Sequence, residues 1–244
     1  QGVICEGPAC PDLIAPRATI RLTGAADPGT RLLPGLLRAF AATRGLVWQD
    51  QTPAPGQAWA ATLRDPAGDR TLADLSFIPA DPDSATAALA DGGAELVLSL
   101  LEDPRFTARP LALDALVPVM APDNPTPRVS TVNLAKALSG EVTNWAQLGG
   151  PDMPLVLHGL APETDMARAL AARLGMDPAI TVTHPDLASL DAAVARDPWA
   201  LAITGRSETA AARPVPLTDS CGFPLLPTPI AVKAQDYPLF ERVI

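Results

Sequence analysis

The chain has 244 residues, 48% of them hydrophobic and 4% aromatic, which is enough to bury a substantial core in one large or two small domains. It carries 27 Asp and Glu against 18 Lys and Arg, for a net charge of −9 with no basic run, which argues against nucleic acid and anionic membranes as partners. No apolar stretch approaches the roughly 20 residues that span a bilayer. The first residues lack the features of a signal peptide, so we expect a soluble mature or excised piece.

The first part of the chain predicts short alternating elements, because 28 prolines punctuate the sequence. Alternation predicts a strand at residues 18–24, and apolar spacing predicts an amphipathic helix at residues 29–45. Residues 82–93 are typical of a helix capped by Asp83 or Ser84. Further strands are expected at residues 46–51, 61–65, 69–78 and 94–100.

The second part repeats this pattern after the apolar run 111–122 and a linker-like DNPTPR. Helices are expected at residues 130–140, 162–175 and 189–198, and strands at residues 153–159, 180–184, 199–205 and 227–234. Alternating strands and helices predict crossover connections and largely parallel sheets. Ligands then bind beyond the carboxyl ends of the strands, at the turns into helices.

Catalytic and metal-binding motifs are missing from the sequence. His158 and His184 have no nucleophile motif, zinc motif or P-loop lysine near them, so we expect structural roles for both and no cofactor. Hydrolysis by Glu163 or Asp165 with His158 would be the enzymatic alternative, but carboxylates in a first helical turn are already explained by the helix dipole. The sequence therefore predicts a protein that is not an enzyme.

The three cysteines leave two alternatives open. Cys5 and Cys10 are separated by four residues that include Gly7 and Pro8, a loop tight enough to close in an oxidising compartment. Alternatively all three cysteines, including Cys221, are reduced. An odd count leaves at least one thiol without a partner in the chain.

The turn LTGAADPGTRLLP is a candidate anion site. The chain leaves a strand at Thr23 and Gly24 and enters a helix near Gly29 and Thr30, which brings backbone N–H groups and two hydroxyls to the strand end. An ordinary capped turn explains the motif equally well.

Several segments resemble, in order and spacing, the phosphate-type substrate-binding proteins of ABC transporters. The similarity covers most of residues 18–244 and is greatest to a subgroup in which the binding module precedes an outer-membrane-protein-A-like, peptidoglycan-binding domain. The opening CEGPACPDL resembles the join, in that subgroup, between a small N-terminal domain and the binding module. The segments that carry it are ADGGAELVLSL, LALDALVPVMAPDNP, LSGEVTNWAQLGG, PLVLH, LAITG and YPLFER.

This resemblance implies an α/β, two-lobed type II periplasmic-binding-protein fold with mostly parallel sheets and two hinge strands. Lobe 1 would comprise residues 18–111 plus 213–244 and lobe 2 residues 112–212, after an N-terminal extension or linker at residues 1–17. The protein would be a periplasmic or cell-envelope solute-binding module that closes over a small anion such as phosphate between its lobes. Its partners would be an ABC transporter permease, or peptidoglycan through a further domain.

The family's ligand-binding positions can be placed on this sequence. They correspond to Thr23, Gly29, Thr30, Ser84, Ser99 and Thr164. Where the family has an Arg and a Ser-Gly-Thr turn, this chain has LHGLAPETD, with Pro162, Glu163 and Thr164 in the turn, and Leu100 and Leu101 replace a Ser-Arg pair. An acid beside a bound anion is repulsive in a dry site. These departures keep open the alternative of a cell-envelope interaction or scaffold domain that has lost solute binding.

Trp145, within the polar stretch VTNWAQLGG, has two alternative roles. The resemblance implies that its indole pins a loop against the second lobe, because a buried ring contributes much apolar contact and its N–H needs one acceptor. The alternative is that the ring stacks on a sugar or an aromatic ligand.

Overall fold

The structure is a computed structural model that describes residues 17–244. Its contacts divide the chain into two compact units, one ending at Ser99 and the other comprising Leu100–Ile244. Cys5, Cys10 and most of the expected N-terminal extension lie outside the described residues. None of the helices between residues 17 and 244 combines the length and apolar character needed to cross a bilayer.

The first unit is built on a five-stranded sheet with the order β2-β3-β4-β1-β5. Its strand β1 runs parallel to β4 and β5, whereas β2, β3 and β4 pair antiparallel, so the sheet is mixed rather than mostly parallel as expected. The strands are β1 (Ala18–Gly24), β2 (Val47–Gln51), β3 (Trp59–Arg64), β4 (Thr71–Pro79) and β5 (Leu96–Leu98).

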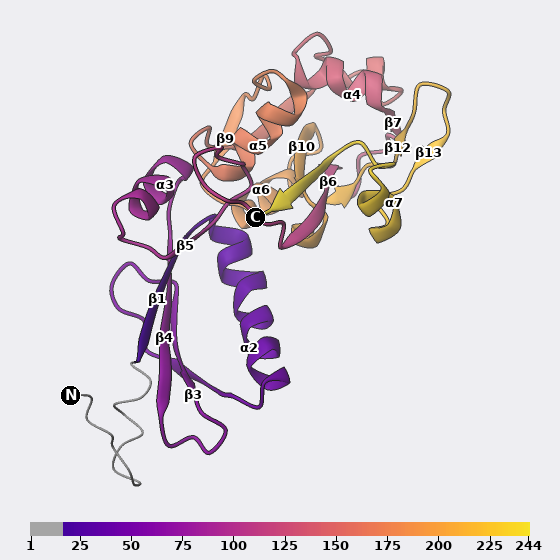
Figure 1. The fold of residues 1–244 in the computed structure, drawn as a ribbon. Helices are drawn as coiled ribbons and strands as arrows, with labels where there is room; N and C mark the ends of the chain where they lie inside the picture. Colours follow the sequence, from indigo (N-terminus) through magenta and orange to yellow (C-terminus); the bar gives the residue numbers. More distant parts are fainter. Residues whose placement is uncertain (1–16) are drawn as a thin grey trace, which may run out of the picture. The chain divides into compact units, whose positions relative to one another are not determined.

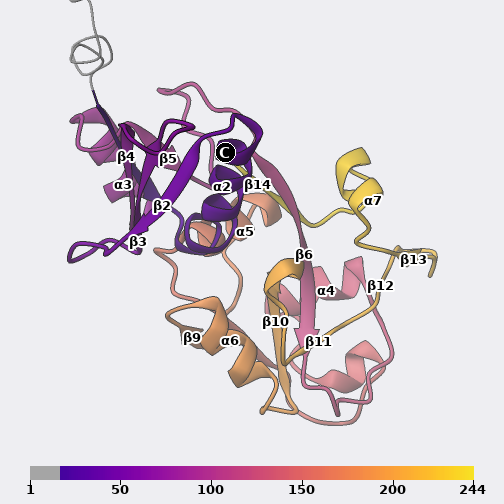
Figure 2. The ribbon, with the colours of Figure 1, turned by 90° about the horizontal axis from the view of Figure 1, so that it is seen from below.

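Helices cover both faces of this sheet. A continuous helical run from residue 26 to residue 43 contains the π-helical turn η1 (Pro28–Leu32) and α2 (Leu33–Thr43). This run and α3 (Pro82–Ala90) lie on opposite sides of the sheet (Figure 1 and Figure 2). α3 is capped by Asp81 rather than by Asp83 or Ser84, because the Asp81 carboxylate accepts from the backbone N–H groups of both those residues.

The second unit is a larger α/β assembly with a six-stranded mixed sheet and a small three-stranded one. Figure 2 shows β6, β10 and β11 side by side. Its strands are β6 (Ala112–Met120), β7 (Val129–Ser130), β8 (Val156–Leu160), β9 (Val182–His184), β10 (Ala200–Gly205), β11 (Arg213–Pro214), β12 (Leu217–Thr218), β13 (Pro224–Leu225) and β14 (Phe240–Val243). Its helices are α4 (Thr131–Leu138), η2 (Trp145–Leu148), α5 (Asp165–Leu174), α6 (Leu187–Val194), η3 (Arg206–Glu208) and α7 (Pro229–Ala234).

β6 organises the second unit because its residues 115–120 are buried and it pairs antiparallel with β10, β11 and β14. The Tyr237 hydroxyl donates to the Leu116 carbonyl at 3.0 Å, which fastens the C-terminal segment to this strand. Residues 213–244 supply β11 and β14, which both find their hydrogen-bond partners on β6.

The expected strand at residues 227–234 is wrong, because this segment forms the helix α7. Its apolar residues suggested a strand, but the residues at its start cap a helix and so favour helix over strand. Thr228 accepts a hydrogen bond from the Ala231 N–H, and Pro229 occupies the first helical turn, where its missing N–H costs nothing.

Trp145 braces the second unit, as the sequence predicts. Its side chain is 0% exposed within the main core, and its Nε1 donates to the Trp199 carbonyl at 2.8 Å. The neighbouring loop leaves no spare room, since a Cβ on Gly150 would lie 2.3 Å from Thr126 Oγ1. With the indole fully buried, stacking on a ligand is excluded for this conformation.

Replacing Trp145 by Phe should therefore lower the free energy of unfolding by about 1–3 kcal/mol, because the smaller ring leaves part of a buried site unfilled and the Trp199 carbonyl keeps only the Val156 N–H of its two donors. The measurement is urea unfolding followed by circular dichroism. The matched control is Trp48→Phe, whose Nε1 bonds the exposed Asp50 and whose loss should cost under about 1 kcal/mol. Equal losses for the two variants would contradict the bracing role of Trp145.

Candidate functional site

The candidate site of the first unit is the edge of the sheet where three parallel strands end together. In the register of β1, Gly24 faces Pro79 of β4 and Leu98 of β5. The Ala25 N–H donates to the Leu98 carbonyl at 2.8 Å, and the Ala80 N–H donates to the Gly24 carbonyl at 2.9 Å. The chain thus leaves all three strands at one edge, into the helical run 26–43, into α3 and into Ser99.

Gly24 is required at this edge. Its φ is +122°, and a Cβ would lie 2.0 Å from the Leu98 carbonyl oxygen. A side chain is therefore excluded by backbone conformation and by space together. This close approach keeps the end of β1 tight against the end of β5.

Three of the predicted ligand-binding residues meet at the start of the helical run, but their polar groups already have partners. Thr23 is buried and its hydroxyl donates to the Ile78 carbonyl at 2.8 Å. The Thr30 hydroxyl donates to the Ala26 carbonyl at 2.8 Å. The Gly29 N–H donates to the Ala25 carbonyl at 3.1 Å, inside the helix.

Gly29 serves packing, which the sequence analysis missed. A Cβ at this position would lie 1.9 Å from the Phe77 ring, and the Gly29 carbonyl accepts from Trp59 Nε1 at 2.8 Å. The Trp59 and Phe77 rings stack with their centroids 6.1 Å apart. The glycine lets the helix approach this aromatic pair.

The helical run begins without a capping side chain. Residue 25, which precedes it, is an alanine and offers no acceptor to the first N–H groups of the helix. Each of the five helices α3 to α7 instead begins with an acceptor side chain that takes a backbone N–H. These caps are Asp81, Ser130, Thr164, Asp186 and Thr228.

Ser84 lies at the start of α3, where both of its hydrogen-bond donors, the backbone N–H and the hydroxyl, are bonded to Asp81. The Ser84 N–H and hydroxyl donate to the two carboxylate oxygens of Asp81 at 3.0 and 2.6 Å. The hydrogen bonds from Ser84 lower the pKa of Asp81, so this carboxylate stays ionised near neutral pH. The sequence analysis missed Asp81, although an acid before Pro82 at a helix start is a capping signal.

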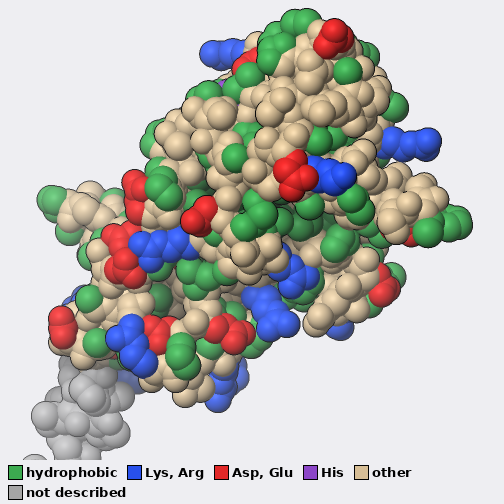
Figure 3. Space-filling view, turned by 90° about the horizontal axis from the view of Figure 1, so that it is seen from above, with side chains coloured by type: hydrophobic (Ala, Val, Ile, Leu, Met, Phe, Trp, Pro, Cys, Tyr) green, Lys and Arg blue, Asp and Glu red, His purple; other side chains and the backbone are tan. Residues whose placement is uncertain are grey.

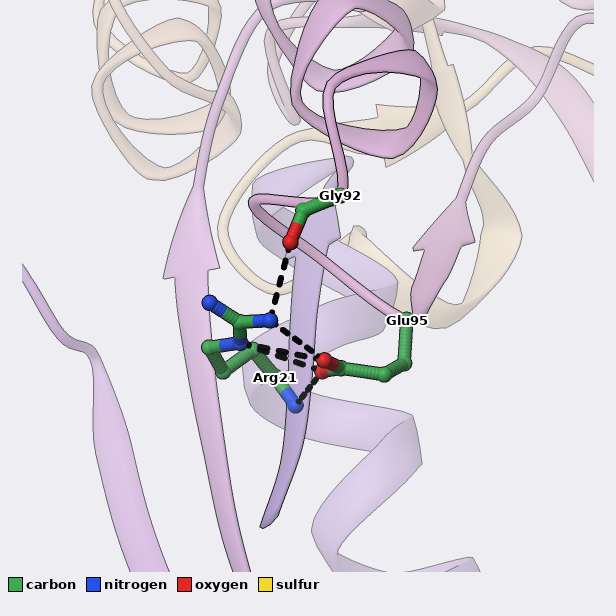
Figure 4. A network of polar contacts seen from close by, with 3 residues as sticks. All are labelled: Arg21, Gly92 and Glu95. Atoms are coloured by element: carbon green, nitrogen blue, oxygen red, sulfur yellow. Dashed lines mark hydrogen bonds and ion pairs between the residues drawn. The ribbon is translucent and has the colours of Figure 1, made fainter.

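The loop that leads to Ser99 is held by an ion pair (Figure 4). The Arg21 guanidinium bonds the Glu95 carboxylate, the Arg21 N–H donates to it at 2.6 Å, and the guanidinium also donates to the Gly92 carbonyl at 2.9 Å. These hydrogen bonds lower the pKa of Glu95 to about 2, and the largest contribution comes from the Arg21 guanidinium. The pair fixes the entry to β5, after which Ser99 lies half-buried.

Thr164, the remaining predicted residue, belongs to the second unit and caps α5. Its hydroxyl oxygen accepts from the Ala167 N–H at 3.3 Å and donates to the Ala161 carbonyl at 2.8 Å. The next residue, Asp165, is buried at the first turn of the helix. The Thr164 hydroxyl therefore stabilises the start of α5.

The two histidines of the chain meet in the second unit. His158 Nδ1 lies 3.0 Å from His184 Nε2, and His158 Nε2 lies 3.3 Å from an Asp197 carboxylate oxygen. His158 is buried, and the pKa of His184 is lowered by desolvation and by its histidine neighbour, against an opposing effect of Asp186. Sequence separation hid this pair, since the two histidines are 26 positions apart.

Charges and metal-ligand groups point to no other site. On the face drawn in Figure 3, basic and acidic side chains are interspersed. Within residues 17–244, no group of three or more His, Cys, Asp or Glu side chains is placed to hold a metal ion. Cys221 is exposed and forms no disulfide among the described residues.

A family model described as a PBP superfamily domain matches residues 81–241, about two thirds of the chain. The chain therefore belongs to the PBP superfamily. One segment of 41 residues is 46% identical to the phosphate-binding protein PstS of Borreliella burgdorferi, and it covers 17% of this chain and 15% of that relative. The sequence match thus spans only a small part of the relative.

Solved structures share the two-lobed periplasmic-binding-protein-like fold. One is a Clostridium perfringens protein described as a phosphate ABC transporter substrate-binding protein with bound phosphate; the identity is 14%, the TM-score 0.70, and the match covers 92% of this chain and 84% of that one. Another is the effector-binding domain of QuiR in complex with shikimate, at 13% identity and a TM-score of 0.54, covering 91% of this chain and 96% of that one. The fold is confirmed, and it accommodates more than one ligand chemistry.

The histidine pair predicts that stability falls in mild acid. The folded pKa of His184 lies below its usual value of 6.5, so the unfolded chain binds more protons below that pH. The stabilisation is complete above pH 6.5 and is lost as the pH falls through the lowered folded pKa.

Melting temperatures measured between pH 7.5 and 5.5 should therefore decrease for the natural chain and decrease less for His184→Gln. His184 titrates within this window in the unfolded chain, whereas carboxylates titrate mainly below it. An unchanged slope in the variant would show that the pair does not couple folding to pH.

Proposed function

We propose that the chain is an extracytoplasmic solute-binding module, rather than an enzyme, that takes a small anion such as phosphate. The observation that carries the proposal is the helical run 26–43, which starts at the strand-end edge of the first unit and is preceded by an alanine instead of a capping residue. Its N–H groups and its helix dipole suit an oxyanion. Membership of the PBP superfamily supports the same reading.

The donors in this proposal are chiefly backbone groups. Thr23, Thr30, Ser84 and Thr164 each donate their hydroxyl proton to an acceptor of the chain. A hydroxyl has one proton, so each of them would have to turn away from its partner before donating to an anion. Gly29 would shape the helix start, and Ser99 follows the neighbouring strand end.

The proposed partners follow from the relatives. A binding module of this class would deliver its ligand to an ABC transporter permease, in the periplasm or at the cell envelope. Attachment to peptidoglycan through an outer-membrane-protein-A-like domain is part of the same proposal. So are the division into residues 18–111 plus 213–244 and 112–212, and closure of the lobes over the anion.

A second candidate is an interaction or scaffold domain of the cell envelope that has lost solute binding. The observation that favours it is Asp81, an ionised carboxylate that already occupies donors at the start of α3. A phosphate dianion nearby would meet a like charge. Ligand titration separates the two candidates.

Phosphate at 100 times its dissociation constant should stabilise the protein by about 2.7 kcal/mol. In Ala25→Ser, the new hydroxyl oxygen would accept from the uncapped N–H groups and compete with the anion, so the stabilisation by phosphate should shrink. Thermal unfolding with phosphate, sulfate and small carboxylates, shikimate included, measures both effects.

The matched control is Ala42→Ser, an exposed position near the other end of the same helix, which should keep the full response to phosphate. No stabilisation by any anion in the panel would remove the solute-binding proposal and favour the scaffold domain. A full response to phosphate in Ala25→Ser as well would show that the anion binds elsewhere.

Asp81→Asn should strengthen phosphate binding on the order of tenfold, because asparagine still caps α3 while the like charge is removed. Asp91→Asn, at the opposite end of α3, provides the control for a change in total charge. Isothermal titration calorimetry gives both affinities. If Asp81→Asn binds more weakly, the carboxylate accepts a proton from the ligand instead of repelling it.

A further inference from the structure

The second unit contains a pocket of about 310 Å³ between α5, β8 and the segment 177–183. It is distinct from the candidate anion site, because every residue that lines it belongs to the second unit and none of the predicted anion donors is among them. Its volume lies at the lower end of the range of small-molecule sites.

The walls of this pocket are mainly apolar. Met166 and Leu170 of α5, which are both buried, line it together with Leu160 of β8, Ile203 of β10 and Ile180. Such a lining lowers the free energy of apolar molecules that leave water.

One wall is fixed by close packing between Gly159 and Ile180. A Cβ on Gly159 would lie 2.7 Å from Ile180 Cδ1, so the glycine lets the segment 177–183 approach β8 closely. The Thr181 N–H and hydroxyl both bond the Leu157 carbonyl, at 2.9 and 3.0 Å, and hold this segment in place. The pocket is therefore preformed on this side.

The charges of the lining select neither anions nor cations. Arg168 and Asp177 both line the pocket and carry opposite charges. His158 also lines it, but its two ring nitrogens are directed to His184 and Asp197, neither of which is a lining residue. A charged ligand would lose its hydration on entry, and the lining side chains offer little interaction energy to compensate for that loss.

We propose that this pocket binds a small, neutral, mostly apolar molecule with the bulk of an aromatic ring system or a short hydrocarbon chain. The site is independent of the anion site, and its occupant would lie against the helix that Thr164 caps. Failure of the anion proposal leaves this one standing, because none of the predicted anion donors lines this pocket.

The test is titration of the full chain with N-phenyl-1-naphthylamine, a neutral apolar fluorophore, at pH 7.5. We expect a saturable rise in fluorescence with one site per chain and a higher melting temperature at saturation. Ala171→Leu and Ala167→Leu add a side chain at two lining positions and should each weaken binding on the order of tenfold.

Ala172→Leu is the matched control, since this alanine is exposed, neighbours Ala171 on α5 and does not line the pocket. It should bind the fluorophore as the natural chain does. Equal affinity in all variants, absence of saturation, or a melting temperature lowered by the fluorophore would overturn the proposal. Tighter binding of a carboxylate analogue would overturn the assignment of a neutral ligand.

Discussion

The first unit depends on the parallel pairing of β1 with β4 on one side and with β5 on the other. Parallel strands end at the same edge, so this pairing brings Gly24, Pro79 and Leu98 together although they are far apart in sequence. The Arg21–Glu95 pair contributes by fixing the entry to β5. As an exposed ion pair it adds little stability by itself, but with the N–H of Arg21 it helps to set the register.

The second unit is organised differently, around the buried strand β6 and its antiparallel partners. Tyr237 and Trp145 are its two largest fully buried side chains, and each gives its one donor to a backbone carbonyl, of Leu116 and Trp199. A large ring with a satisfied polar atom stabilises a core and also specifies which loop packs where. This explains why an indole occurs in the polar stretch VTNWAQLGG.

Periodic and capping signals predicted most strands and helices, and with the resemblance they predicted the fold. What the sequence could not provide is pairing between distant segments. The strand β6 recruits β14 from the far end of the chain, and His158 meets His184 only because β8 and β9 pair. The helix α7 was mistaken for a strand because Thr228 and Pro229 carry the capping signal outside its apolar residues.

The candidate site shows the same limit more sharply. Thr23, Gly29 and Thr30 were chosen for their chemistry and lie at the expected edge, yet the fold uses their polar groups for its own hydrogen bonds. The informative residue was instead Ala25, which is unremarkable in a sequence until its position before a helix is known. A missing cap cannot be recognised before the helix boundary is fixed, and boundaries are the least certain part of a sequence prediction.

At two other places in the chain, an aspartate side chain accepts hydrogen bonds from several backbone N–H groups. Asp191 is buried and accepts from the N–H groups of residues 210, 211 and 212, and Asp81 does the same for α3. The start of the helical run 26–43 has no such side chain from residue 25, so an external oxyanion would fill there the role that Asp81 and Asp191 fill elsewhere. The net charge of −9 repels anions at long range, and salt screens that repulsion over about 10 Å at 0.1 M. If the chain binds an anion as proposed, short-range N–H donors at the helix start would have to select it.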